Sequence, residues 1–195
     1  PGSSPGATSS SAPASPSPAS PSTAKLTPVQ LAGQRVIYSY TGTTVPSSLL
    51  KLIREGEVAG VIFFSSNITS VSQLASVTKE LDAAQAAGPV HLPLLLMTDQ
   101  EGGEVRRIAN GNPTQSQLSI GQSSNPAQAA AAAWTGAAQT LSDAGLNVNL
   151  APVLDVYAVP GNFIDSAQRS YSSDPALVSA AGAAFITAQQ KGGLV

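Results

Sequence analysis

Short apolar runs alternate with amphipathic helical segments through most of this chain, and that alternation constrains the fold more than any other feature. The apolar runs, which we expect to be strands, lie at residues 36–38, 61–64, 94–97 and 148–154. The segments with helical spacing of apolar residues lie at residues 46–55, 71–87, 126–144 and 175–190. Strands that alternate with helices predict an α/β fold with a parallel sheet.

Local signals support two of these helices. Ser70 precedes the second helical segment and is placed to cap it, and the pair Gly88-Pro89 ends it. The third segment is rich in alanine and stops at Gly145, with Trp134 on its apolar stripe. We interpret the Trp134 stripe as helix packing rather than as a platform for a sugar ring.

The number of strands bears on the kind of α/β fold. Residues 192–195 have the composition of the start of a fifth strand. A TIM barrel has eight strands and about 250 residues. We therefore expect a (β/α)8 TIM barrel of which only about the first half is present, namely strands one to four and the start of strand five. An unclosed half barrel exposes apolar strand edges, so we expect further sequence or another chain to complete it.

The N-terminal segment differs in composition from the rest of the chain. Residues 1–24 are almost wholly Pro, Ser, Ala, Gly and Thr, which bury too little apolar surface to offset chain entropy. We interpret them as a disordered linker and residues 25–195 as the folded part. Because Ser/Pro tracts commonly tether exported domains, we expect a secreted or cell-envelope location, with attachment to membrane or cell wall as one use of the tract. A flexible intracellular tail is the alternative.

The net charge and the residue content of the chain argue against several classes of binding function. Nine basic and eleven acidic side chains give a net charge of −2. The sequence therefore lacks the excess of positive charge that is typical of proteins that bind nucleic acid or an anionic membrane surface. No apolar run reaches the roughly 18 residues of a membrane span. The sequence has no cysteine, no His/Asp cluster with metal-ligand spacing and no phosphate-binding Gly-rich loop. We therefore expect neither a cofactor nor a metal.

Polar residues directly after the apolar runs are the candidates for function, because active sites of parallel barrels lie at the carboxyl ends of the strands. The most informative segment starts at Asp99 and continues through Gly102-Gly103 to Arg107. Carboxylate and guanidinium groups together suit a polyhydroxylated ligand. On residue pattern alone, a helix-capping Asp with solvated charges beside it is an equally good interpretation.

Four stretches resemble glycoside hydrolase family 3, in its bacterial β-N-acetylhexosaminidase branch. They are Gly60 to Asn67 (GVIFFSSN), Asp99 to Arg107 (DQEGGEVRR), Gly145 to Val156 (GLNVNLAPVLDV), and Arg169-Ser170-Tyr171 with Asp174-Pro175. The resemblance spans about residues 26–195. It implies that Asp99 and Arg107 bind hydroxyls of the non-reducing-end sugar, with Arg169 as a third contact. The sequence departs from the family where Tyr171 replaces Phe, where Ser172 replaces Gly, and at residues 165–168.

The resemblance also implies which groups perform the chemistry. Retaining glycosidases of this branch use an Asp nucleophile late in the barrel and a His proton donor after strand five, so we expect both beyond Val195 and no catalytic residue within this chain. The single histidine, His91, precedes strand three and is expected on the surface. We discount Glu101 and Glu104 as catalytic groups, placing Glu101 in a turn. Two further polar residues, Asp155 and Asn67, are expected to hold loops or an arginine.

These features predict an enzyme that removes terminal β-linked N-acetylglucosamine from cell-wall or chitin-type oligosaccharides with retention of configuration. The chain of 195 residues is expected to be inactive by itself. One alternative is a non-catalytic, secreted carbohydrate-binding protein on a degenerate barrel. Another is a β-glucosidase of the same family, which the Asp-Gln-Glu-Gly-Gly run disfavours.

Overall fold

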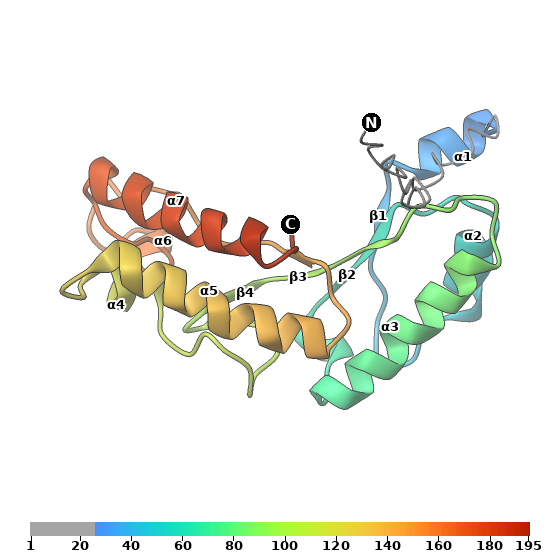
Figure 1. Ribbon diagram of the computed structural model, residues 1–195, viewed down its shortest axis with the longest axis horizontal. Helices are drawn as coiled ribbons and strands as arrows, with labels where there is room; N and C mark the ends of the chain where they lie inside the picture. Colours follow the sequence, from blue (N-terminus) through green and yellow to red (C-terminus); the bar gives the residue numbers. More distant parts are fainter. Residues whose placement is uncertain (1–25) are drawn as a thin grey trace, which may run out of the picture.

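A four-stranded parallel sheet forms the centre of the molecule (Figure 1). The computed structural model describes residues 26–195, so the predicted linker at residues 1–24 lies outside the described residues. The order of the strands in the sheet is β1-β2-β3-β6. Their bounds are Ile37–Tyr38 for β1, Gly60–Phe63 for β2, Leu95–Thr98 for β3 and Val148–Asn149 for β6.

A helical crossover separates each pair of neighbouring strands. The longer helices are α2 at Ser47–Arg54, α3 at Val71–Ala86, α5 at Pro126–Asp143 and α7 at Pro175–Lys191. Shorter helical segments are α1 at Pro28–Gly33, η1 at Ser65–Asn67, α4 at Gln117–Gly121 and α6 at Phe163–Ser166. Strands that pair in chain order, each joined to the next through a helix, confirm the predicted first part of a TIM barrel.

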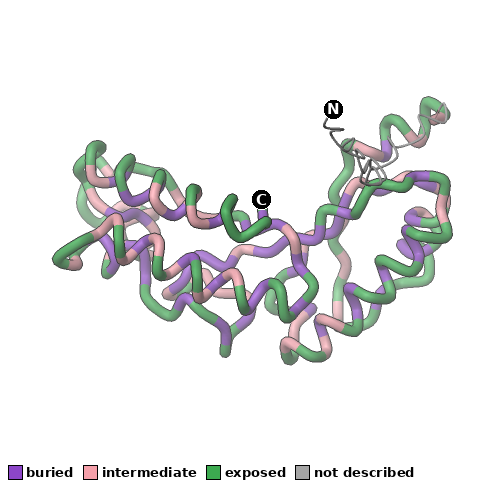
Figure 2. The backbone as a smooth tube through the Cα atoms, viewed as in Figure 1, coloured by how far each residue is buried: buried purple, intermediate pink, exposed green. Residues whose placement is uncertain are grey.

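Along the helices, buried and exposed residues alternate, as the colours of the backbone tube show (Figure 2). The two faces of the sheet also differ in burial. One face packs against the helices and includes Val61, Phe63 and Leu96, which are at most 1% exposed. On the other face, Ile37 and Leu95 are 38% and 42% exposed and belong to one row across the strands. This second face is the one that a complete barrel would enclose, and within residues 26–195 it is only partly covered.

Helix signals in the sequence act as expected. The Ser70 hydroxyl accepts a hydrogen bond from the backbone N–H of Gln73 and caps α3. Gly145 follows α5 with a φ of 74°, a backbone conformation that glycine adopts without strain. Trp134 on α5 is 2% exposed and packs edge-on against Phe185 of α7, with ring centroids 5.7 Å apart. The predicted packing role of Trp134 is therefore confirmed.

The fourth predicted strand is shorter than the apolar run. The prediction of a strand over residues 148–154 was wrong, since β6 covers only Val148–Asn149. The Gln117 side chain explains the difference, because its amide accepts from the N–H of Val153 and donates to its carbonyl, both at 2.8 Å. These bonds direct the run toward α4 and away from the sheet.

The end of the chain begins a fifth strand, as predicted. Val195 donates its N–H to the carbonyl of Asn147 at 3.1 Å and accepts from the N–H of Asn149 at 2.9 Å. This alternation is the hydrogen-bond pattern of a parallel strand pair. Val195 therefore lies beside β6. Within the described residues, no helix is long and apolar enough to cross a bilayer.

Asn67 fixes the loop that follows β2. Its side chain is fully buried, accepts from the N–H of Phe64 and donates to the carbonyls of Tyr40 and Gly42. The predicted loop-holding role is confirmed by these three bonds.

Asn67→Ala leaves one buried N–H and two carbonyls without that partner, so we expect the free energy of unfolding to fall by about 2 kcal/mol. Urea unfolding of the purified protein measures the change. Ser66→Ala, in the same turn and exposed, is the control and should be neutral. Equal effects of the two substitutions would contradict the role assigned to Asn67.

Candidate functional site

The carboxyl ends of three strands meet at one rim of the sheet. Phe63 of β2 pairs with Thr98 of β3, and Thr98 pairs with Asn149 of β6. The buried Thr98 hydroxyl donates to the Phe63 carbonyl at 2.8 Å and links two of these ends directly. The polar segments that follow the strands therefore start from one row, as expected for the functional end of a parallel barrel.

Two buried amides join this row to the segment that follows β3. The N–H of Gln100 donates to Asn149 Oδ1 at 3.0 Å, and Asn149 Nδ2 donates to the Gln100 carbonyl at 3.3 Å. The Gln100 side chain accepts from the N–H of Ile108 and donates to the carbonyls of Ile108 and Asn112. Every polar group of the Gln100 side chain is thus engaged, and the segment is fixed at both of its ends.

Residues 100–106 form a β-hairpin that the sequence did not predict. Strand β4 at Gln100–Gly102 pairs antiparallel with β5 at Val105–Arg106. Placing Glu101 in a turn was therefore wrong, because it lies on β4. The turn follows at Gly103 and Glu104. Gly102, which ends β4, and Gly103 have φ values of 105° and 58°, which suit glycine.

Asp99 and Arg107 form the first ion pair of the rim. Arg107 Nε and Nη2 each lie 3.1 Å from the same oxygen, Asp99 Oδ2. The side chains of Asp99 and Arg107 are 19% and 30% exposed, so a ligand can reach them. Asp99 Oδ1 has no hydrogen-bond partner among residues 26–195 and is available as an acceptor. The Arg107 guanidinium also lies 6.0 Å from the ring centroid of Phe64.

Arg169 and Glu101 form the second pair. Arg169 Nε donates to Glu101 Oε2 at 2.9 Å and Nη2 donates to Oε1 at 2.7 Å, which is a bidentate arrangement. The Glu101 side chain is 3% exposed, whereas that of Arg169 is 24% exposed. The hydrogen bonds to Glu101 raise the pKa of Arg169, and the nearby charges of Glu101, Asp99 and Asp155 act in the same direction. Both pairs start from the same rim, because Asp99 and Glu101 lie two residues apart directly after β3.

The loop that carries Arg169 is held at several points. Gln168, next to Arg169, has a φ of 54°, and its side chain accepts from the Ser116 hydroxyl at 2.9 Å. The N–H of Arg169 donates to the carbonyl of Ile164 on the short helix α6 at 3.0 Å. The buried Ser170 donates its hydroxyl to the carbonyl of Asp155. The backbone on both sides of Arg169 is therefore fixed relative to the rim.

The other candidates play lesser parts. His91 is exposed and precedes β3, as expected, and Glu104 is exposed in the hairpin turn. Asp155 is exposed near Arg169, but its backbone carbonyl rather than its carboxylate makes the loop contact. Tyr171 is 1% exposed, burial raises the pKa of its hydroxyl, and that hydroxyl has no partner within the described part of the chain. Residues 26–195 contain no group of three or more His, Asp or Glu side chains placed to hold a metal.

Residues 30–195 match the family model of the glycosyl hydrolase family 3 N-terminal domain. The chain belongs to glycoside hydrolase family 3. The match confirms the resemblance found in the sequence and covers the sheet, the hairpin and the Arg169 loop. The sugar-binding roles of Asp99, Arg107 and Arg169 stay predictions.

Individual relatives agree with the family assignment. An uncharacterized secreted glycosyl hydrolase of Arthroderma benhamiae is 45% identical over 166 residues, covering 84% of this chain and 46% of that protein. Beta-hexosaminidase A of Pseudoalteromonas piscicida is 34% identical over 158 residues, covering 78% of this chain and 26% of that protein. The family 3 chain thus spans less than half the length of either relative.

Solved structures show the same fold. A family 3 beta-N-acetylglucosaminidase from Paenibacillus sp. has a TM-score of 0.80 at 33% identity, with 87% of this chain and 32% of that chain covered. A beta-N-acetylhexosaminidase from Beutenbergia cavernae has a TM-score of 0.74 at 31% identity, with 88% and 52% covered.

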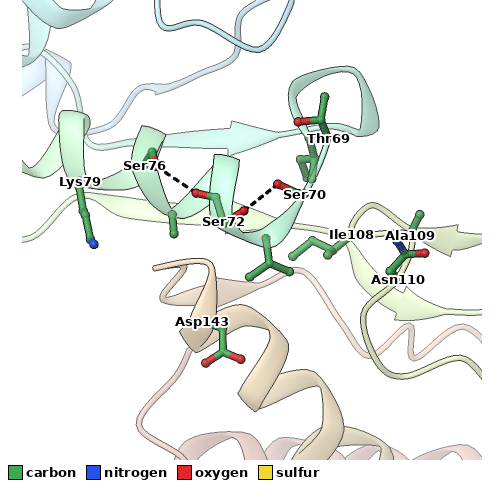
Figure 3. Close-up of a pocket in the computed structure, with 12 residues that line it drawn as sticks. Thr69, Ser70, Ser72, Ser76, Lys79, Ile108, Ala109, Asn110 and Asp143 are labelled. Carbon is green, nitrogen blue, oxygen red and sulfur yellow. Dashed lines mark hydrogen bonds between the residues drawn. The ribbon is translucent and has the colours of Figure 1, made fainter.

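Away from the rim, a hollow lies between α3, the turn at residues 108–110 and the end of α5 (Figure 3). Its hydroxyls largely bond to one another and to the helix: Ser70 Oγ lies 3.1 Å from Ser72 Oγ, and Ser76 Oγ donates to the Ser72 carbonyl. Lys79 and Asp143 supply its charges. No arginine lines this hollow, and among residues 26–195 the two arginine–carboxylate pairs both lie at the rim.

The rim residues differ in what they contribute to stability. We expect Asp99→Ala to lower the free energy of unfolding by about 1 kcal/mol or less, because its ion pair is partly exposed. We expect Gln100→Ala to lower it by about 3 kcal/mol, because the Ile108 and Asn112 backbone groups lose buried partners. Chemical denaturation of both variants measures the difference. A larger loss for Asp99→Ala would show that Asp99 is a structural residue.

Proposed function

We propose that the whole protein is a retaining glycosidase that removes terminal β-linked N-acetylglucosamine. The observation that carries the proposal is the presence of two arginine–carboxylate pairs, Asp99–Arg107 and Glu101–Arg169, on one rim of a family 3 chain. Relatives named as hexosaminidases and an N-acetylglucosaminidase structure support the choice of sugar.

The chemistry of the rim fits a neutral, polyhydroxylated ring. Asp99 Oδ1 is an open acceptor for a hydroxyl proton, and a carboxylate oxygen accepts more than one such bond. Arg107 and Arg169 offer N–H donors to ring hydroxyl oxygens. Because each arginine already has a carboxylate partner, the site attracts a polar ligand without demanding that the ligand carry charge.

The rim holds the sugar rather than cleaving the bond. Retention requires a nucleophilic carboxylate and a separate acid/base group on opposite sides of the scissile bond. Glu101 is buried with both oxygens bonded to Arg169, and we assign the open oxygen of Asp99 to a sugar hydroxyl, so neither carboxylate is proposed as nucleophile or acid/base group. We place the nucleophile Asp and the His proton donor in sequence outside these 195 residues. The contacts at the rim then position the terminal sugar for attack.

The substrate is proposed to be an oligosaccharide of cell-wall or chitin type, met outside the cytoplasm. The Pro/Ser/Ala-rich composition of residues 1–24 supports an exported protein with a tether to membrane or cell wall. The relative from Arthroderma benhamiae, named a secreted glycosyl hydrolase, agrees with that location.

Hydrolysis of aryl glycosides by the whole protein tests the activity. We expect release from an aryl N-acetyl-β-glucosaminide with retention of configuration by NMR, and far slower release from the aryl β-glucoside. Asp99→Ala removes a charged hydrogen-bond acceptor for the sugar, so kcat/KM should fall about a hundredfold. Faster release of glucose would favour a β-glucosidase, and wild-type kinetics of Asp99→Ala would remove Asp99 from the site.

The chain of 195 residues is predicted to be inactive on the same substrate. The reason is that we place the nucleophile Asp and the His proton donor in sequence outside these 195 residues. Assays of this chain beside the whole protein, at equal concentration, provide the comparison. Hydrolysis by the short chain would place catalytic groups within residues 1–195. Binding of chitin oligosaccharides without hydrolysis by the whole protein would favour a carbohydrate-binding protein.

A further inference from the structure

We propose that Glu101 is a positioning residue, which orients the Arg169 guanidinium so that its outer edge faces the terminal sugar. The inference rests on the proposed function, because it assigns a task within the same sugar site. It concerns a residue that the sequence placed in a turn and gave no role.

The hydrogen bonds divide the guanidinium into an inner and an outer edge. An arginine side chain has five N–H donors in a fixed plane. Glu101 uses the Nε donor and one Nη2 donor, at 2.9 and 2.7 Å. The second Nη2 donor and both Nη1 donors point away from Glu101 and have no partner among residues 26–195. Two of these three donors, one on Nη2 and one on Nη1, share the outer edge of the guanidinium and remain for ligand oxygens.

A phenyl ring contacts the Arg169 guanidinium. The Arg169 guanidinium carbon lies 5.8 Å from the centroid of the Phe163 ring, within the range of a cation–π contact. Phe163 starts helix α6, which the Asn162 side chain caps through the N–H of Asp165. The guanidinium is therefore held along one edge by Glu101 and lies over the exposed ring of Phe163.

Burial separates the task of Glu101 from that of Asp99. The Glu101 side chain is 3% exposed with both oxygens engaged, so a sugar cannot reach it. Asp99 is 19% exposed and receives Arg107 on one oxygen only, which leaves the other for the ligand. The Asp99–Arg107 pair thus offers the ligand both an acceptor and donors, whereas the Glu101–Arg169 pair offers donors only. Glu101 acts on the sugar solely through Arg169.

If Glu101 acts only through Arg169, the effect of substituting Glu101 should depend on the presence of Arg169. A carboxylate with a purely structural role would not show that dependence. Glu101→Gln keeps the shape but loses the charge and one of the two hydrogen bonds, so Arg169 is present without a fixed direction. We expect kcat/KM on an aryl N-acetyl-β-glucosaminide to fall tenfold to about a hundredfold. Arg169→Ala should reduce it at least as much.

A double-mutant cycle in the whole protein tests the inference. If Glu101 acts through Arg169, adding Glu101→Gln to Arg169→Ala should cause no further loss of kcat/KM. Glu104→Gln, in the same hairpin and exposed, is the matched control and should leave kinetics unchanged. Circular dichroism and the Tm of each variant report whether it is folded. Multiplicative losses in the double variant would overturn the inference.

Arg169→Lys provides a test that does not require altering the buried carboxylate. Lysine keeps the positive charge but lacks the planar fork, so we expect a loss as large as that of Arg169→Ala. Wild-type kcat/KM for Arg169→Lys, or for a folded Glu101→Gln variant, would overturn the positioning role and leave the proposed function intact. No release of N-acetylglucosamine by the wild-type protein would overturn both.

Discussion

The contact between Gln100 and Asn149 is the interaction on which the rest of the site depends. It joins the residues that end β6 and follow β3 through two hydrogen bonds between a side-chain amide and backbone. Buried amides that are fully hydrogen-bonded specify one arrangement, because any shift leaves polar groups without partners. Asp99 directly precedes Gln100 in the chain and Glu101 directly follows it. The backbone of these three consecutive residues therefore sets the distance between the two ion pairs.

The electrostatic organisation of the rim follows from burial. Charged side chains at a partly dry rim need partners, and Arg107 and Arg169 each have their own carboxylate. The pairing compensates charge locally and still leaves N–H donors and one carboxylate oxygen without partners within the described residues. Such a rim is suited to recognising directions of hydrogen bonds rather than net charge. That property separates a sugar site from a phosphate or nucleotide site, where uncompensated positive charge is typical.

Much of this arrangement could be predicted from the sequence, and the exceptions have a common cause. The helices and the rim position of Asp99 depend on local signals such as the Ser70 cap and the apolar runs. The pair between Glu101 and Arg169 joins residues 68 positions apart, and no local pattern encodes it. The early end of β6 likewise depends on Gln117, which lies 36 residues from Val153. Only the resemblance to a family pointed to Arg169, and it gave no partner for it.

The order of the strands has a consequence for how such a sheet is made. Within residues 26–195, each strand of the four-stranded sheet after β1 pairs with the strand of that sheet made before it, and Val195 continues this order beside β6. A ribosome therefore delivers β2, β3 and β6 each to a strand that has already been synthesised. The Asp99–Arg107 pair is complete within nine residues of its first member, whereas Arg169 is synthesised only after β6. Vectorial synthesis thus delivers the two ion pairs of the rim in two stages, with the Asp99–Arg107 pair first.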